Sequence, residues 1–233
     1  MTPKRAPGGR PLRRRVATRA IRKTLLIFCE GERTEPEYLN ALKLERAIRE
    51  VAAVEIRVAQ ADSGAVPLTL VKRAIEARSR AVSENDEVDE FWCVFDVEWP
   101  VNHAHLPEAR ALAEANKINL AVSNPCFEAW LILHLKEHGA WLDNDQAMKL
   151  RRKLDSSTDK GLDPAKYMPH VHEASDRAVK LEERHQRNGT SFPHNNPSSG
   201  MHRLIASVQP TDRVISSAAP ARAASPGGRR ARW

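Results

Sequence analysis

Several classes of residue are scarce in this chain of 233 residues. Aromatic residues make up only 5%, and the three cysteines, Cys29, Cys93 and Cys126, show no CxxC or other metal-ligand spacing. Each cysteine lies in an apolar run, which is typical of a small core residue in a reduced, cytoplasmic protein. No apolar run is long enough for a membrane helix, and the N-terminus lacks the apolar core of a signal peptide. The glycine motifs that bind nucleotide phosphates are also missing, so we do not expect this chain to hydrolyse ATP.

Charge of one sign dominates at each end of the chain. Residues 1–23 contain nine lysines and arginines and no acid, and residues 208–233 contain five arginines and one aspartate. The middle of the chain carries a net charge of −6, although the whole chain carries +7. We interpret residues 1–22 as a flexible basic arm whose Arg13, Arg14 and Arg15 contact nucleic-acid phosphates. The alternative is that both ends are disordered and only aid solubility.

Strands alternate with helices along the first part of the chain. This order predicts an α/β core over residues 23–140, with a parallel sheet of about four strands flanked by helices. Helical patterns continue over residues 141–208 and predict a helical annex, and residues 209–233 are expected to be disordered. The expected strands are Leu25–Cys29, Val54–Ala59, Phe91–Glu98 and Ile118–Ser123, and the expected helices are 35–50, 68–82, 107–116, 126–138, 144–155, 170–187 and 195–208.

Carboxylates follow two of the apolar strands. Glu30 comes directly after the first strand, and Asp96 and Glu98 end the third strand two residues apart, which places both on one face. Ligands of parallel sheets collect at the carboxyl ends of the strands, and clustered carboxylates normally hold a cation or share a proton. Hard oxygen ligands favour Mg²⁺ or Mn²⁺. The alternative is that Glu30 caps a turn and the other two acids face solvent.

The helix after the first strand has its own start pattern. Thr34 and Glu37 are spaced as a capping box, in which each side chain bonds the backbone of the other residue. Arg33 and Thr34 lie beside Glu30 and are candidates for phosphate contact.

A further acid follows the fourth strand. Asn124 and Pro125 are expected to cap and open a helix that has Glu128 in its first turn. Glu128 is either a favourable charge at the helix N-terminus or an additional carboxylate of the site.

Four histidines give weaker signals. His134 and His138 fit the pattern H-x-x-E-H of zinc peptidases, with both rings expected on one face of a helix, but no third ligand is marked. His103 and His105 follow the third strand and are candidates to approach the metal or the leaving group, or are simply exposed.

Four motifs in order, CEGERTEPEYL, FWCVFDVE, SNPCFEAWLILH and NNPSSG, resemble the RloB family of Toprim-like proteins, which are encoded near restriction and phage-defence genes. The resemblance covers about residues 24–207. It implies that Glu30 is the general acid/base and that Asp96 and Glu98 bind Mg²⁺, with Glu30 also near the metal. The sequence departs from the family pattern at Glu98, where the second acid of DxD is a glutamate, and at Ser63-Gly64, where the loop is poor in glycine.

Two hypotheses of function follow. The first is a Mg²⁺-dependent phosphodiesterase, a nuclease of DNA or RNA in bacterial antiviral defence by abortive infection. The second is a non-catalytic nucleic-acid-binding or regulatory partner of an ATPase encoded nearby, as the resemblance also implies. The longer Glu98 and the missing glycines motivate the second hypothesis.

Overall fold

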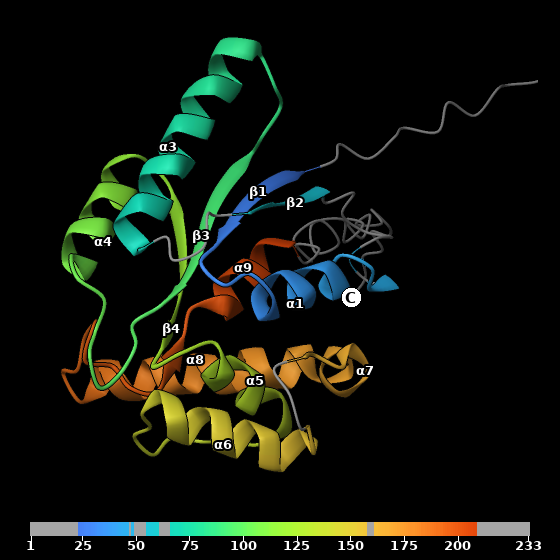
Figure 1. The fold of residues 1–233 in the computed structure, drawn as a ribbon, viewed down its shortest axis with the longest axis vertical. Coiled ribbons are helices and arrows are strands. Elements are labelled where there is room, and N and C mark those ends of the chain that lie inside the picture. The colour runs from blue at the N-terminus through green and yellow to red at the C-terminus, as the bar shows by residue number, and fades with distance from the viewer. Residues whose placement is uncertain (1–22, 47, 49–54, 61–65, 158–160, 209–233) are drawn as a thin grey trace, which may run out of the picture.

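The computed structural model describes residues 23–46, 48, 55–60, 66–157 and 161–208. Their centre is a five-stranded sheet in the order β2-β1-β3-β4-β5 (Figure 1). The first four strands are parallel, and the fifth pairs antiparallel with β4. The predicted parallel α/β sheet is therefore confirmed, with one short antiparallel strand added. The strands are β1 Thr24–Cys29, β2 Glu55–Gln60, β3 Glu90–Asp96, β4 Asn119–Asn124 and β5 Ser198–Ser199.

Side chains of the central strands alternate between two cores. On β3, Trp92 and Val94 pack into one core, whereas Phe91, Cys93 and Phe95 pack into the other. This period of two is what a strand buried on both faces requires. Both faces of the sheet are therefore covered by helices.

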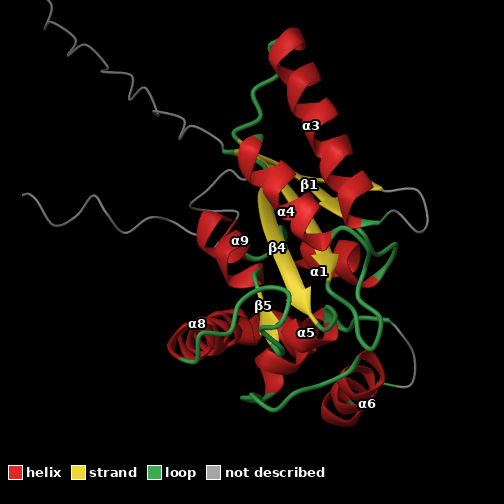
Figure 2. Cartoon of the chain, turned by 90° about the vertical axis from the view of Figure 1, so that its left-hand side faces the viewer, coloured by secondary structure: helices red, strands yellow, loops and turns green. Residues whose placement is uncertain are grey.

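Helices α3 (Pro67–Glu84) and α4 (Leu106–Ala115) cover one face, as Figure 1 shows. The other face packs against α1 (Thr34–Leu42), α5 (Glu128–Leu135), α8 (Val171–Arg187) and α9 (Met201–Val208). Helix α5 lies between α8 and α6 (Asn144–Asp155), which is clear in Figure 2. A short α7 (Pro164–Tyr167) and a 3-10 turn (Met168–His170) lead into α8.

The helices expected over 144–155 and 170–187 are confirmed as α6 and α8 to within a residue at each end. Asp143 explains the start of α6, because its side chain accepts from the Gln146 N–H and Gln146 bonds back to the Asp143 N–H. All three cysteines are buried and free, as expected. In the described ranges, no helix has both the length and the apolar content to cross a membrane.

Three expected helices are shorter than predicted. The helix expected over 35–50 ends at Leu42, and its last part lies largely outside the described residues. The helix expected over 126–138 spans only Glu128–Leu135. The helix expected over 195–208 begins at Met201, because Ser198 and Ser199 form β5 against β4.

The prediction that Asn124 caps a helix and Pro125 opens it is wrong. The Asn124 side chain bonds the Trp99 indole and the Pro193 carbonyl, so it is not available to cap α5. The residue before α5 is Phe127, which makes no side-chain cap. The predicted arm at residues 1–22, with Arg13, Arg14 and Arg15, the tail at 209–233 and the Ser63-Gly64 loop lie outside the described residues.

Candidate metal centre at the carboxyl ends of the strands

Glu30 joins the carboxyl ends of β1 and β3. Its own N–H donates to the Val94 carbonyl at 3.0 Å, which extends the pairing of the strands by one residue. Its carboxylate Oε2 accepts from the backbone N–H of Asp96, also at 3.0 Å. The side chain is 17% exposed. The backbone therefore holds the Glu30 carboxylate against the end of the neighbouring strand.

His103 lies against the other oxygen of Glu30. Its Nε2 is 2.6 Å from Glu30 Oε1 and 3.8 Å from Glu98 Oε2, and its backbone N–H donates to the Val97 carbonyl. The short contact to Glu30 raises the pKa of His103 although burial opposes this. A protonated His103 is therefore stabilised between the two carboxylates.

Asp96 is the last residue of β3, and its carboxylate is only partly compensated, by a hydrogen bond from the Phe127 N–H. Its Oδ1 is shielded from solvent and has no hydrogen-bond partner among the described residues. Burial raises the pKa of Asp96 well above its usual value, and the carboxylates of Glu35, Glu30 and Glu128 raise it further. A buried acceptor without a donor is uncommon in native proteins and calls for a proton or a cation.

Glu35 is a fifth acid, which sequence reasoning missed. It lies in the first turn of α1 and is 6% exposed, and burial raises its pKa to about 7, with further contributions from Glu128 and Glu30. A Cβ on Gly31 would lie 2.1 Å from Glu35 Oε2, so this glycine makes room for the carboxylate. The available signal was an acid on the first helical turn after the strand that ends at Glu30.

Thr34 and Glu37 do not form the predicted capping box. The residue before α1 is Arg33, and no side chain caps the helix. Glu37 instead accepts from Arg33 Nε at 2.9 Å and from the Leu162 N–H at 3.0 Å. Its carboxylate is drawn toward a segment distant in the sequence, which local spacing could not reveal.

The prediction that Glu98 follows Asp96 on the same strand face is wrong. Strand β3 ends at Asp96, and Glu98 has a φ of +65°, a left-handed conformation that is uncommon outside glycine. Its N–H donates to the Pro125 carbonyl at 2.7 Å, and its side chain is 43% exposed. This turn, and not strand alternation, brings the Glu98 carboxylate to His103.

Glu128 is the first residue of α5 and is half-buried. Its carboxylate contributes to the raised pKa values of Asp96 and Glu35, and, after burial, to that of the Cys126 thiol. It therefore lies close to the other acids while also occupying the helix N-terminus. We call Glu30, Glu35, Asp96, Glu98 and Glu128 the acid rim.

The other candidates lie in different settings. Arg33 pairs with Glu37 and keeps a side chain that is 59% exposed, next to the half-buried Thr34. His105 precedes α4, is 64% exposed and pairs with Glu108 at 3.1 Å. Whether Arg33 and Thr34 contact phosphate stays a prediction.

The zinc-peptidase pattern is not realised. Helix α5 ends at Leu135, so His138 does not share a helical face with His134. His134 is buried, with Nε2 3.0 Å from the Tyr38 hydroxyl and Nδ1 3.0 Å from the Trp130 carbonyl. Burial lowers its pKa to about 4. It is a core histidine with both ring nitrogens engaged.

The donor set of the acid rim suits a hard divalent cation. Its members are carboxylates, and Asp96 Oδ1 has no partner in the described part of the chain. Within that part, no three His, Cys, Asp or Glu side chains are arranged as a ready set of metal ligands. Both Glu30 oxygens are occupied, one by His103 and one by the Asp96 N–H. Side-chain rearrangement at Glu30 and Glu98 would therefore accompany binding of a cation.

The profile of the RloB-like protein family matches residues 25–208. This range contains every member of the acid rim and all of the sheet except Thr24. No curated protein and no solved structure matches the chain.

Proposed function

Because the chain belongs to the RloB-like protein family, we propose that it is a cytoplasmic Mg²⁺- or Mn²⁺-dependent phosphodiesterase that cuts nucleic acid in bacterial antiviral defence. The observation that carries the chemical part is Asp96, whose Oδ1 is buried without a partner among carboxylates that raise its pKa. A divalent cation would satisfy that oxygen and neutralise its neighbours. The role in defence rests on the motif resemblance alone.

Glu30, Asp96 and Glu98 would hold the cation, which when bound polarises a phosphodiester and lowers the pKa of a water. Glu30 serves as general acid/base, and its 2.6 Å contact with His103 allows a proton to pass between them. Glu35 and Glu128 add negative charge behind these residues and strengthen attraction for a cation. The Asp96 N–H fixes the orientation of the Glu30 carboxylate.

The test compares the full chain with Asp96→Asn and Glu30→Gln. We expect both variants to lose Mg²⁺-dependent cleavage of labelled RNA or DNA while keeping the circular dichroism spectrum of the unmodified protein. Glu76→Gln, at an exposed position of α3, is the matched control and should cleave normally. Persistent cleavage by both rim variants would refute the assignment.

A second candidate is a non-catalytic nucleic-acid-binding or regulatory partner of an ATPase. It is favoured by the absence, in the described ranges, of three side chains arranged as ready metal ligands, and by the exposed turn position of Glu98. Isothermal calorimetry with Mg²⁺ and Mn²⁺ separates the two functions. Metal uptake that Asp96→Asn abolishes supports the enzyme, and no uptake supports the partner.

A further inference from the structure

A groove of about 330 Å³ lies away from the acid rim, between α8 and the segment that follows α5. Four cations of α8 line it, Arg177, Lys180, Arg184 and Arg187, together with His138 and Gly139. The cations are spaced by three, four and three residues, which places them along one face of the helix. We call this feature the α8 basic groove.

Two of the cations are fixed to the end of α5. Arg177 donates to the Leu133 and His134 carbonyls at 2.6 and 3.0 Å, and Arg184 donates to the Gly139 carbonyl at 2.5 Å. A Cβ on Gly139 would lie 2.3 Å from Arg184 Nη1, so the glycine allows the guanidinium to approach. The floor of the groove is thus rigidly built, with positive charge at the carbonyl end of a helix.

The groove contains polar atoms that lack partners. His138 Nε2 and Arg184 Nε are shielded from solvent and make no hydrogen bond within the described residues. Native proteins satisfy nearly all such buried groups, so these two atoms are left uncompensated beside the hollow. The adjacent cations make an anion the ligand that fits.

Lys180 and Arg187 are exposed, and no hydrogen bond or ion pair engages their side chains in the part of the chain that the structure describes. The acids Glu137 and Glu183 also line the groove but form no ion pair with the cations there. Helix packing explains Arg177 and Arg184, but it does not explain two free cations in line with them. The middle of the chain is acidic overall, so the row of cations is a local feature.

We propose that the α8 basic groove binds the phosphate backbone of a nucleic acid. Helix α5 connects it to the acid rim, with Glu128 at the first end of the helix and the carbonyls held by Arg177 near the other. Eight helical residues span about 12 Å, which corresponds to a few nucleotides of a strand. This role rests on and deepens the proposed function, because it supplies phosphate contacts for the nucleic acid that the carboxylates would cut.

The experiment measures binding of a short fluorescein-labelled RNA, and of DNA with the same sequence, by anisotropy in EDTA. The full chain is compared with the double variant Lys180→Gln/Arg187→Gln. The control Lys72→Gln/Arg80→Gln removes the same charge from exposed positions of α3. We expect the groove variant to weaken binding and to reduce the slope of log Kd against log salt by about two, and the control to change neither.

Equal changes in affinity and salt slope in the two double variants, or no change in either, would refute nucleic-acid binding by the α8 basic groove. Because binding is measured without metal, this outcome is independent of cleavage. If Lys180→Gln/Arg187→Gln binds nucleic acid as the unmodified protein does, and metal-dependent cleavage is intact, the role of the groove is refuted and the phosphodiesterase is not. If the groove variant binds more weakly but the unmodified protein cleaves no nucleic acid, the groove is supported and the phosphodiesterase is refuted. Circular dichroism of both double variants verifies that they fold.

Discussion

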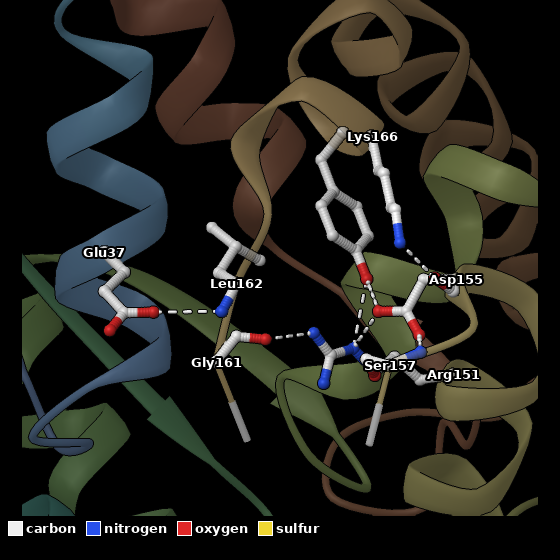
Figure 3. A network of polar contacts seen from close by, with 8 residues as sticks. Glu37, Arg151, Asp155, Ser157, Gly161, Leu162 and Lys166 are labelled. Atoms are coloured by element: carbon white, nitrogen blue, oxygen red, sulfur yellow. Dashed lines mark hydrogen bonds and ion pairs between the residues drawn. The ribbon is translucent and has the colours of Figure 1, made fainter. Parts of the chain in front are cut away.

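Asp96 and Asp155 both end a regular element with a shielded carboxylate, but their surroundings are opposite. Asp155, at the end of α6, accepts from the Tyr167 hydroxyl, the Ser157 N–H and Arg151 Nε, the last at 2.7 Å (Figure 3). Burial opposes ionisation, but these partners outweigh it and lower the pKa of Asp155. Asp96 has an oxygen without a partner among the described residues and a raised pKa.

The difference marks Asp155 as a structural carboxylate and supports the proposal that Asp96 binds a cation. Around Asp155 the carboxylate is well supplied with donors, and Arg151 also donates to the Tyr167 hydroxyl and to the Gly161 carbonyl. A network of this kind holds two segments together. Around Asp96 the Phe127 N–H is opposed by three further acids, which disfavour the ionised carboxylate unless a proton or cation is bound.

The largest expected effect is the loss of the Asp155 charge. Asp155→Asn removes the carboxylate that neutralises the buried Arg151 guanidinium, and we expect the free energy of unfolding to fall by about 3–5 kcal/mol. The lowered pKa means that this stability is full above the usual aspartate pKa and is lost as the pH falls through the folded value. Urea unfolding across acidic pH should show the two proteins converging at low pH.

Asp176→Asn, at an exposed position of α8, is the control for that experiment and should change stability little. If the free energy of unfolding of Asp155→Asn falls by less than about 1 kcal/mol, the network contributes little to stability.

Gly31→Ala tests how tightly the acid rim is packed. The added Cβ would lie 2.1 Å from Glu35 Oε2, so the buried carboxylate must move, and we expect a loss of about 1–3 kcal/mol in urea unfolding. Gly189→Ala offers a contrast, since nothing lies within 4 Å of its Cβ and only its φ of +65° is strained. Combining Gly31→Ala with Glu35→Ala should give less than the sum of the single losses. Strict additivity would show that the two residues do not collide.

Glu37 links α1, the helix that carries Glu35 of the acid rim, to the Asp155 network. Its carboxylate accepts from the Leu162 N–H at the edge of that network (Figure 3). We expect Glu37→Ala to reduce the unfolding free energy by about 0.5–1.5 kcal/mol. Glu37→Gln retains an acceptor for the Leu162 N–H and should lose less. Thermal unfolding of the two variants in parallel measures the difference, and equal losses would assign the effect to the Arg33 ion pair instead.

The smallest expected loss is at Asp96. In metal-free buffer, Asp96→Asn should unfold at the same or a higher temperature than the unmodified protein, because the amide removes a charge that burial disfavours. Addition of Mg²⁺ should then raise the melting temperature of the unmodified protein only. A marked loss of stability in metal-free Asp96→Asn would place this residue with Asp155.

The four parallel strands and the position of Glu30 at the end of the first were predictable from the sequence, because they follow from the alternation of apolar strands with helices. Apolar runs broken by carboxylates mark strand ends, and Glu30 and Asp96 indeed share the rim through the bond to the Asp96 N–H. Glu35 was hidden, since an acid in a first helical turn normally faces solvent and nothing local marks it as buried.

Long-range contacts explain the remaining differences. Glu98 depends on a left-handed turn anchored to Pro125, and strand alternation could not foresee it. Ser198 and Ser199 became a strand because β4 offered an unpaired edge, which overrides the helical pattern of the residues that follow. The cations of α8 could be read from the sequence, but the carbonyls that hold Arg177 come from α5, which is distant in the sequence.

Strand β5 has a consequence for how other chains can approach. Its two residues, with the Gly200 N–H donating to the Val122 carbonyl at 2.8 Å, cover the outer edge of β4 close to where β4 ends. A Cβ on Gly200 would lie 3.0 Å from Val122 N, so the cover is closely fitted. An exposed edge invites a foreign strand to join the sheet, and β5 already occupies the pairing positions of Ser123 and Asn124. A peptide that paired with β4 at these residues would have to displace β5.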